Sequence, residues 1–263
     1  QSHKGLLRHI VARQVDDTIS ITLVLNGNSL PQYEVLIDLL KNNINLKFNL
    51  FYCINKIKSN TILTDDIKLL YGQQEQITTD FNIEYFISPT SFLQVNRFIQ
   101  NKIYETILNN VNESDILIDA YSGAGLLTSI LSQKAKQVYG IEIVKSATEN
   151  ANLLMKHNNI KNVKNINGDC SIVLPKLINE INLSNNSISL VLDPPRKGCD
   201  QNVLNAINLS KPNQILYLSC NPATLARDLK ILSDTYKIEF IKPFDMFPQT
   251  KHIETLVKLA RIF

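Results

Sequence analysis

Residues 216–229 read LYLSCNPATLARDL, and this stretch places a cysteine at the junction of a strand and a helix. Residues 214–219 form a short apolar run of strand length. From Pro222 onward the apolar residues have helical spacing, with Asn221 as the N-cap. We therefore expect Cys220 at the mouth of a helix, where the partial positive charge of unpaired amides favours the thiolate. The alternative is that Cys220 is a small apolar residue closing a strand.

Strands and helices alternate regularly upstream of this stretch. The pattern predicts strands at 115–120, 137–143, 163–168 and 188–192, and helices at 97–110, 126–133, 145–157, 171–180 and 201–209. Such alternation is typical of a doubly wound α/β sheet with crossover helices. The last two strands, 237–241 and 255–262, follow one another without a helix, so we expect an antiparallel closing pair.

The sequence predicts two domains. Residues 1–86 are expected to form a small α/β subdomain, with a strand at 19–25 that ends at the turn Asn26-Gly27, and a helix at 33–41. Residues 87–263 are expected to form the catalytic domain. Because the chain begins at Gln1 within a predicted strand lead-in and without a methionine, we interpret the first domain as the remnant of a longer N-terminal region.

Composition bounds the class of protein. The chain has 263 residues, a hydrophobic content of 44% and a charged content of 19%, which are ordinary for a globular protein. Its net charge of +3 is compatible with an anionic partner. The four cysteines are widely spaced, so no metal site is predicted and a reducing, cytoplasmic setting is favoured. No signal peptide, membrane-spanning run or obligate protein partner is evident.

The segment Asp119–Gly125 reads DAYSGAG and follows the first strand of the series. Its glycines, Gly123 among them, let a backbone turn pass close to a nucleoside cofactor. Because the third glycine of the dinucleotide pattern is absent, a dehydrogenase loop is disfavoured. Glu142, 19 residues after Gly123, is placed to accept hydrogen bonds from a ribose in NAD or S-adenosylmethionine, with a solvated strand end as the alternative. Asp169, after the third strand, is the corresponding candidate for an adenine contact.

The segment 193–198 reads DPPRKG and ends the fourth strand. Two prolines stiffen this loop and restrict Asp193, whose carboxylate is expected to point across the crevice. Amino-group methyltransferases carry a similar Pro-Pro loop followed by an aromatic residue that stacks on the target base. Arg196 stands at that position, which disfavours methylation of an exocyclic amine.

Five motifs together resemble the uracil-C5 RNA methyltransferases, which use S-adenosylmethionine and act on ribosomal or transfer RNA. They are Phe92–Asn96, Asp119–Gly125, Asp193–Gly198, Ser219–Asp228 and Asp245–Thr255, in the family order. The resemblance implies a class I (Rossmann-like) methyltransferase sheet with an antiparallel closing strand. It also implies that Cys220 is the nucleophile and Glu254 the base. Residues implied to line the cofactor and substrate site are Gln94, Tyr121, Glu142 and Asp193.

Members of that family commonly carry an upstream β-barrel RNA-binding domain and sometimes a four-cysteine iron–sulfur site. Neither is visible in this sequence, so we do not expect this chain alone to select its RNA. The predicted function is methyl transfer from S-adenosyl-L-methionine to C5 of a uridine in RNA, with 23S rRNA favoured over tRNA. The alternatives are a methyltransferase for another acceptor and a catalytically silent RNA-binding or assembly factor.

Four other side chains compete for roles in the site. Cys199 is a rival thiol, although it lacks a helix-mouth context. His252 could be taken for a base, but a position beside the pocket is the simpler interpretation. Arg196 and Arg227 could hold phosphate or the uracil carbonyl, and solvated positions are the alternative for both.

Overall fold

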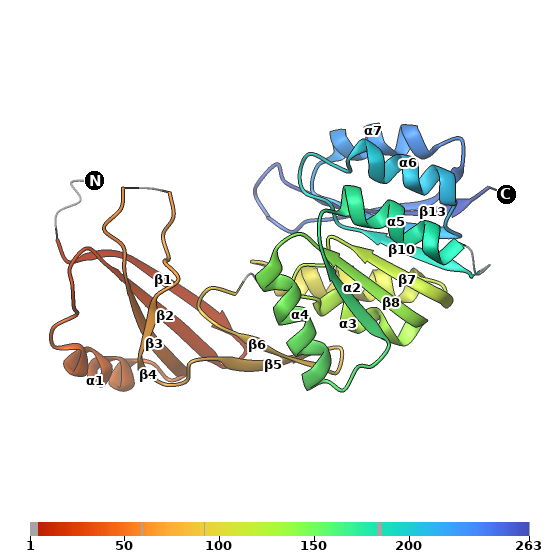
Figure 1. Cartoon of the computed structure of the whole chain (residues 1–263). Helices are drawn as coiled ribbons and strands as arrows, with labels where there is room; N and C mark the ends of the chain where they lie inside the picture. Colours follow the sequence, from red (N-terminus) through yellow and green to blue (C-terminus); the bar gives the residue numbers. More distant parts are fainter. Residues whose placement is uncertain (1–4, 59, 92, 183–185, 263) are drawn as a thin grey trace. The chain divides into compact units, whose positions relative to one another are not determined.

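The computed structural model describes residues 5–58, 60–91, 93–182 and 186–262 (Figure 1). The chain divides into two compact units. The first comprises Gln1–Thr79 and Glu84–Phe92, and the second comprises Asp80–Ile83 and Leu93–Phe263. The main change of unit therefore falls at residues 92–93, whereas the sequence analysis placed it at 86–87.

The first unit is built on a four-stranded sheet of order β1-β2-β3-β4. The hairpin β5-β6 follows along the chain, and its tip, Asp80–Ile83, is assigned to the second unit. Strands β2 and β3 are parallel and are joined through α1, whereas β1-β2 and β3-β4 are antiparallel pairs. The element bounds are β1 Leu7–Val15, β2 Thr18–Leu25, α1 Tyr33–Asn43, β3 Lys47–Ile54, β4 Ile67–Tyr71, β5 Gln76–Asp80 and β6 Ile83–Ile87. The predicted strand at 19–25 and helix at 33–41 correspond to β2 and α1.

The helix of this first unit covers one face of its sheet. Leu23 and Leu25 of β2 and Leu50 of β3 are buried in a cluster with Ile37 of α1.

The hairpin turn between β5 and β6 has positive φ at two successive residues, Phe81 and Asn82. Two such residues favour a turn whose twist matches that of the flanking strands.

The second unit contains a seven-stranded sheet of order β12-β13-β11-β10-β7-β8-β9. Strands β7 to β11 pair in parallel, and β13 is antiparallel to both β11 and β12. The strands are β7 Ser114–Ala120, β8 Ala135–Glu142, β9 Val163–Asn167, β10 Ile188–Leu192, β11 Gln214–Ser219, β12 Tyr236–Phe244 and β13 Glu254–Arg261. The predicted doubly wound sheet and its antiparallel closing pair are therefore confirmed.

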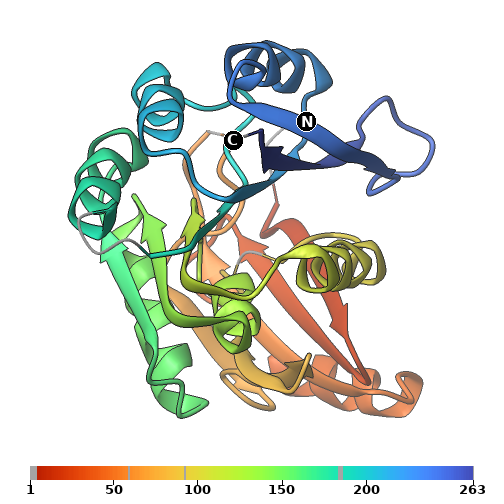
Figure 2. The ribbon, with the colours of Figure 1, turned by 90° about the vertical axis from the view of Figure 1, so that its right-hand side faces the viewer.

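Helices lie on both faces of this sheet (Figure 2). They are α2 Arg97–Asn110, α3 Leu126–Leu131, α4 Lys145–His157, α5 Cys170–Asn182, α6 Gln201–Ser210 and α7 Pro222–Leu232. One core cluster joins α5, α6 and α7 to the sheet through residues such as Leu174, Val203 and Leu225. A separate cluster joins α2 and α3 to the other face, with Ile103, Ile107 and Leu131 buried in it. The successive parallel strands are thus sealed on both sides, as their near-continuous apolar sequences require.

Local chemistry sets several of the helix ends. Asn96 caps α2 by accepting a hydrogen bond from the Ile99 amide at 3.2 Å. The predicted helix at 126–133 is shorter than expected, because α3 ends at Leu131 and a 3-10 turn covers Ser132–Lys134. The hydroxyls of Ser129 and Ser132 donate to carbonyls three residues earlier, an alternative to regular helical bonding that weakens a helix at its end.

Candidate active site

The antiparallel closing strand brings Cys220 and Glu254 together. Strand β11 ends at Ser219, and β13 begins at Glu254. Ser219 pairs with Thr255 in the antiparallel ladder, so the next position on each chain places Cys220 beside Glu254. A parallel β13 would put its first residue at the opposite edge of the sheet. The direction of this one strand therefore joins two residues that are 34 positions apart in the sequence.

Asp193 lies at the same edge of the sheet. It follows β10, whose last residue, Leu192, pairs with Tyr217 of β11 and with Ala120 of β7. The Asp193 amide donates to the Ala120 carbonyl at 3.4 Å. The site thus lies where β7 and β10 meet and the strand order reverses, which is where open α/β sheets bind their ligands.

The environment of Cys220 opposes formation of the thiolate. Partial burial of the thiol is the largest cause that raises its pKa, followed by the negative charges of Glu254 and Asp193. Arg196 acts in the opposite direction and lowers the pKa of Cys220. The predicted helix-mouth position is confirmed, because Asn221 accepts from the Ala223 amide at 3.1 Å and Pro222 begins α7. The expected effect of the helix mouth is outweighed at Cys220, because burial and two carboxylates raise the pKa of its thiol.

The two carboxyl groups near Cys220 have raised pKa values. Glu254 is 8% exposed, and burial raises its pKa while Arg196 lowers it. Asp193 is an exposed residue, although many protein atoms lie around its carboxyl group. This desolvation, followed by the charges of Glu254 and Asp119, raises the pKa of Asp193 to about 7. A raised pKa makes a carboxylate a stronger base, as proton abstraction requires.

A polar network holds the 193–199 loop against α7. Asp228 is fully buried, and its Oδ2 atom accepts from the Tyr217 hydroxyl at 2.6 Å and from the Cys199 amide at 2.9 Å. Its Oδ1 atom accepts from Arg227 Nε at 2.8 Å. Arg227 also donates to the carbonyl of Lys197 at 3.0 Å. Arg227 is therefore bonded within the protein, an arrangement that the sequence analysis did not consider.

The start of α7 holds the same loop at Arg196. The side chains of Asn221 and Thr224 each donate to the Arg196 carbonyl at 3.2 Å. The Arg196 charge lowers the pKa of both Cys220 and Glu254. The Pro-Pro loop and the helix that follows Cys220 therefore form one connected structure, and Arg196 supplies its positive charge to the site.

The rival thiol, Cys199, lies in a different environment. It is 6% exposed, and burial raises its pKa to about 12. Its sulfur is near the hydroxyls of Tyr217 and Tyr121. The hydroxyl of Tyr121 also contacts the thiol of Cys170, and burial holds the pKa of Tyr121 well above its usual range. Tyr121 is thus packed against two buried thiols, and Cys199 is less suited than Cys220 to act as a nucleophile.

The glycine-containing loop after β7 bends sharply and leaves Gly123 open. Tyr121, Gly123 and Gly125 all have positive φ, at 69°, 55° and 83°. A side chain at Gly125 would collide with Ala151 of α4, whereas one at Gly123 would meet nothing within 4 Å. The Gly123 amide donates to Glu142 Oε2 at 2.9 Å. The loop therefore packs tightly on α4 while exposing its centre.

The carboxylates of Glu142 and Asp169 are both engaged by nearby groups. Glu142 also accepts from the Val144 amide through Oε1 at 2.8 Å. Asp169 accepts from the amide and hydroxyl of Ser171, each at 2.8 Å, and these bonds are the main cause that lowers its pKa. Each carboxylate oxygen has more than one acceptor position, so both groups can accept further hydrogen bonds.

Asp119 is a site residue that the sequence analysis did not single out. It is 1% exposed and accepts from the Thr128 hydroxyl at 2.5 Å. Burial raises its pKa to about 7, and the charge of Glu142 adds to the effect. Its place at the head of the glycine-containing loop was the only signal in the sequence.

Gln94 and the loop that leads to Glu254 are connected through the start of α2. Gln94 is half-buried two residues before the capping residue Asn96. The Asn96 side chain donates to the carbonyl of Met246 at 3.4 Å. In that loop His252 lies edge-on to the ring of Phe247, with centroids 6.2 Å apart. Phe92, the first residue of the predicted motif, lies outside the described residues.

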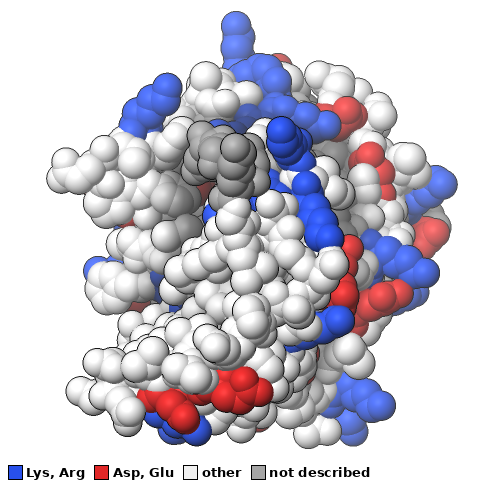
Figure 3. Space-filling view, turned by 90° about the vertical axis from the view of Figure 1, so that its left-hand side faces the viewer, with Lys and Arg blue, Asp and Glu red and all other residues white. Residues whose placement is uncertain are grey.

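The surface in Figure 3 carries both signs of charge. Lys and Arg side chains are more frequent toward its upper part, and Asp and Glu side chains form small groups at its lower end and along one side. Among the described residues in this view, no large patch of one sign covers the face. This mixture agrees with a net charge of +3.

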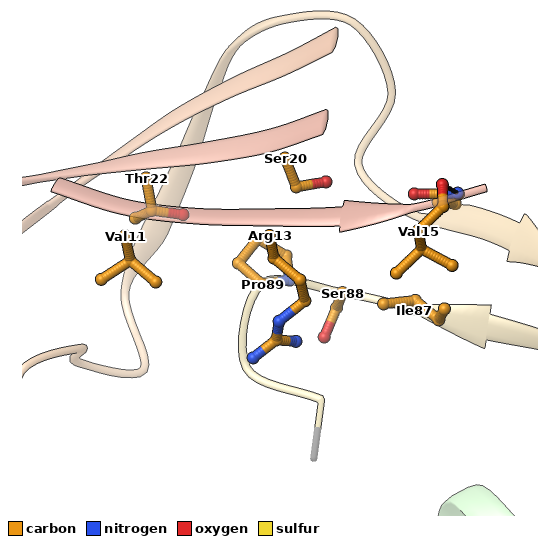
Figure 4. Close-up of a pocket in the computed structure, with 9 residues that line it drawn as sticks. Val11, Arg13, Val15, Ser20, Thr22, Ile87, Ser88 and Pro89 are labelled. Atoms are coloured by element: carbon orange, nitrogen blue, oxygen red, sulfur yellow. Dashed lines mark hydrogen bonds between the residues drawn. The ribbon is translucent and has the colours of Figure 1, made fainter. Parts of the chain in front are cut away.

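A separate hollow lies in the first unit, and none of its lining residues is a predicted site residue. Val11, Arg13 and Val15 of β1 line it together with Ser88 and other residues (Figure 4). Arg13 Nη1 donates to the Ser91 carbonyl at 2.8 Å, so this cation is already bonded within the unit. Over the described ranges, no three His, Cys, Asp or Glu side chains are grouped to hold a metal ion. The part of the chain that the structure describes also has no helix long and apolar enough to cross a membrane.

The sheet order, the antiparallel seventh strand and the ligand-binding edge define the class as a Rossmann-like, S-adenosylmethionine-dependent methyltransferase fold. Comparison with known proteins gives the family. The sequence profile of the tRNA (Uracil-5-)-methyltransferase family matches residues 15–262. The chain belongs to this family.

Two curated relatives are described as uncharacterized RNA methyltransferases. The one from Clostridium tetani is 38% identical over 265 residues, which cover 99% of this chain and 57% of the relative. The one from Bacillus cereus is 38% identical over 267 residues, which cover 100% of this chain and 58% of the relative. This chain therefore spans less than three fifths of the length of these relatives.

Two solved structures are similar to this chain. The tRNA (uracil-54, C5)-methyltransferase of Pyrococcus abyssi, in complex with S-adenosyl-L-homocysteine, has a TM-score of 0.80 at 27% identity, covering 98% of this chain and 60% of that one. TYW2 of M. jannaschii, in complex with AdoMet, has a TM-score of 0.55 at 16% identity, covering 96% of this chain and 100% of that one. The second likeness shows the fold alone.

Proposed function

We propose that this chain transfers a methyl group from S-adenosyl-L-methionine to C5 of a uridine in RNA. The observation that carries the proposal is the position of Cys220 beside Glu254 at the strand edge. Membership of the tRNA (Uracil-5-)-methyltransferase family supports it. The reaction needs a thiol and a carboxyl group that act on the same ring, and the ends of the antiparallel neighbours β11 and β13 carry the two.

The residues around the glycine-containing loop fit S-adenosylmethionine. The open position at Gly123 admits a ligand close to the backbone. Glu142 is the proposed acceptor for the ribose hydroxyls, and Asp169 is the proposed contact for the adenine. Gln94, Tyr121 and Asp193 complete the proposed cofactor site. When bound, S-adenosylmethionine supplies an electrophilic methyl group.

The proposed chemistry assigns separate tasks to Cys220 and Glu254. C5 of uracil is a weak nucleophile, so the Cys220 thiolate first forms a bond to C6 and raises the electron density on C5. After C5 has gained the methyl group it still carries its original hydrogen. Glu254 removes that proton, the C5–C6 double bond forms again, and the thiolate leaves. The target uridine must leave its stack to reach this edge of the sheet.

Covalent trapping tests the division of tasks. Cys220→Ala is expected to form no adduct with RNA and no product. Glu254→Gln is expected to accumulate a methylated protein–RNA adduct that survives denaturing electrophoresis, because elimination stalls. RNA that contains 5-fluorouridine is expected to trap the wild-type enzyme, since fluorine cannot leave as a cation.

Cys199→Ser is the matched control for the thiol. This variant is expected to form the adduct as the wild type does, because the Cys199 thiol that it lacks is buried beside two tyrosines and is not the proposed nucleophile. An adduct that persists in Cys220→Ala and disappears in Cys199→Ser would overturn the assignment. Normal turnover by Glu254→Gln would show that another group takes the proton. Absence of any methylated RNA with the wild-type protein would favour a silent RNA-binding factor.

The class of RNA is part of the proposal. The sequence resemblance favours 23S rRNA over tRNA, whereas the family and the Pyrococcus abyssi enzyme are both named for tRNA. Transfer of labelled methyl groups to purified 23S rRNA and to bulk tRNA, followed by mass mapping of the product, distinguishes the two. We expect 5-methyluridine in the rRNA, and label that enters only tRNA would correct this choice.

Calorimetry tests the proposed role of Glu142 in cofactor binding. Glu142→Ala is expected to weaken S-adenosylmethionine binding tenfold or more, since a hydrogen bond to a charged group contributes about 1.5–3 kcal/mol. Glu149→Ala, which removes an exposed carboxylate from α4, is the control and should bind normally. Equal affinity of the two variants would remove Glu142 from the site.

A further inference from the structure

Two apolar side chains at the start of α2 are exposed to solvent and are not packed in the core of the second unit. Val95 is 87% exposed and Phe98 is 68% exposed, whereas Ile103 and Ile107 on the same helix are buried. The Nζ atom of Lys102 lies 4.2 Å from the centroid of the Phe98 ring. An exposed aromatic ring with a cation on one side is therefore present at the surface of the second unit.

A second cation extends this surface across to β12. The Nζ atom of Lys242 donates to the Thr106 hydroxyl of α2 at 3.1 Å. Phe98, Lys102 and Thr106 are four residues apart in turn, so they share one face of the helix. We name Val95, Phe98, Lys102 and Lys242 the α2 strip. It combines one aromatic face with two cations, and Glu105, on the same face, is a negative charge beside it.

The start of the α2 strip adjoins a proposed site residue along the chain. Val95 directly follows Gln94, one of the proposed site residues. Asn96, which caps α2, donates to Met246 in the loop that leads to Glu254. A strand of nucleic acid whose uridine entered the site would therefore have the strip beside it.

We propose that the α2 strip binds the unpaired RNA strand next to the target uridine, with one base stacked on Phe98 and phosphates at Lys102 and Lys242. This inference rests on the proposed function. An aromatic ring stacks on any base, and lysines contact phosphates without reading sequence. A flipped uridine leaves its neighbours partly unstacked, so a stacking partner beside the site stabilises the open strand.

The test is fluorescence anisotropy with a labelled oligouridine and the full-length protein. Phe98→Ala is expected to weaken binding about fivefold or more, as loss of a base-stacking partner does. Phe98→Trp should bind like the wild type, and Phe98→Leu should be weakened, because leucine keeps the apolar surface but has no aromatic face. Equal binding by Phe98→Leu and Phe98→Trp would indicate a generic apolar contact, such as a protein segment, and would overturn the proposal.

The lysines are tested through the salt dependence of binding. Lys102→Ala and Lys242→Ala should each make the slope of log K against log salt shallower by about 0.7, the value for one phosphate contact on a single strand. Glu105→Gln should strengthen binding, because it removes a negative charge. Leu209→Ala and Lys176→Ala are the matched controls, since they change exposed side chains of α6 and α5 on the other face of the sheet. Controls that lose as much affinity as the strip variants would refute the proposal.

Methyl transfer measured in the same proteins separates the two proposals. If the wild type methylates RNA and the strip variants keep its KM for RNA, the α2 strip is not the RNA surface and the proposed function stands. If the strip variants weaken RNA binding but the wild type forms no 5-methyluridine, the proposed function fails and the strip remains an RNA surface. We expect a raised KM for RNA with unchanged affinity for S-adenosylmethionine.

Discussion

Cys220 is surrounded by charges that act against one another. Burial raises the pKa of the thiol most, Glu254 and Asp193 raise it further, and Arg196 lowers it. Because the pKa of Asp193 is itself raised to about 7, this carboxyl group is only partly ionised near neutral pH. As the pH rises, Asp193 gains its charge and opposes ionisation of Cys220 more strongly. The reactivity of the thiol thus depends on the balance between Arg196 and two carboxyl groups.

The rate of alkylation of Cys220 by iodoacetamide measures this balance, because only the thiolate reacts. Arg196→Leu removes the cation, so the pKa of Cys220 should increase and the pH–rate profile should move to higher pH. Glu254→Gln removes a negative charge, so the profile should move to lower pH. Peptide mass spectrometry assigns the label to Cys220 rather than to the buried Cys53, Cys170 and Cys199.

Arg196→Leu and Glu254→Gln serve as controls for each other, because they remove opposite charges beside the Cys220 thiol. A shift of both profiles in the same direction would show that the substitutions act through altered packing and not through charge. A profile that moves in neither variant would show that the charges of Arg196 and Glu254 do not set the pKa of Cys220.

At the scale of elements, the junction between the 193–199 loop and α7 determines how the site is held. Gly198 has a φ of 78°, and a Cβ atom there would lie 2.6 Å from both Arg227 Nη2 and Asp228 Oδ2. The loop can therefore approach the buried Asp228 only with glycine at this position. The same approach lets the Cys199 amide donate to Asp228 and fixes the loop that carries Asp193 and Arg196.

Gly198→Ala is expected to destabilise the protein more than Gly123→Ala does. Both glycines have positive φ, which costs a non-glycine residue about 1–2 kcal/mol. Only Gly198 also faces a collision, and overpacking adds about 1–3 kcal/mol. Urea denaturation measures the difference in the free energy of unfolding. Equal destabilisation by the two substitutions would show that the side chains of Arg227 and Asp228 can move away from a Cβ atom at position 198 without loss of stability.

At the scale of the whole molecule, charge limits how tightly the chain holds RNA. The net charge is +3, and the face in Figure 3 mixes both signs. Only a few phosphates can therefore be neutralised at once. The curated relatives are considerably longer than this chain, which covers 57% of the Clostridium tetani protein. Selection of a particular RNA is a property that we propose for the longer protein.

The 263-residue chain is expected to bind RNA weakly and with a modest dependence on salt. With contacts at two or three lysines, the slope of log K against log salt on single-stranded RNA should be about −1.4 to −2.1. Anisotropy titrations between about 50 and 200 mM salt measure it. Tight and salt-insensitive binding to one RNA would show instead that this chain contains its own recognition surface.

The sequence by itself determined the elements of the second unit and their order. The helix at 97–110 and the strands at 188–192 and 214–219 were predicted with the bounds that the structure has, because apolar periodicity is a local signal. Strands β3 to β6 were not predicted. Strands β4, β5 and β6 have five residues each, so their own residues carry little of the signal. Strand β3 has eight residues and was missed although its sequence, KFNLFYCI, is rich in strand-forming residues.

Only the tertiary structure decided how the candidate site works. The sequence named Cys220 and Glu254, but their proximity comes from the direction of β13. The raised pKa of Cys220 arises from burial and from carboxyl groups on other elements. In the sequence, nothing distinguishes Arg227 and Asp228 from other residues of a helix. They form hydrogen bonds to the 193–199 loop because Gly198, which has no side chain, lets the loop lie close to α7. Short-range periodicity cannot encode such contacts, because they join residues that become neighbours only when the sheet has formed.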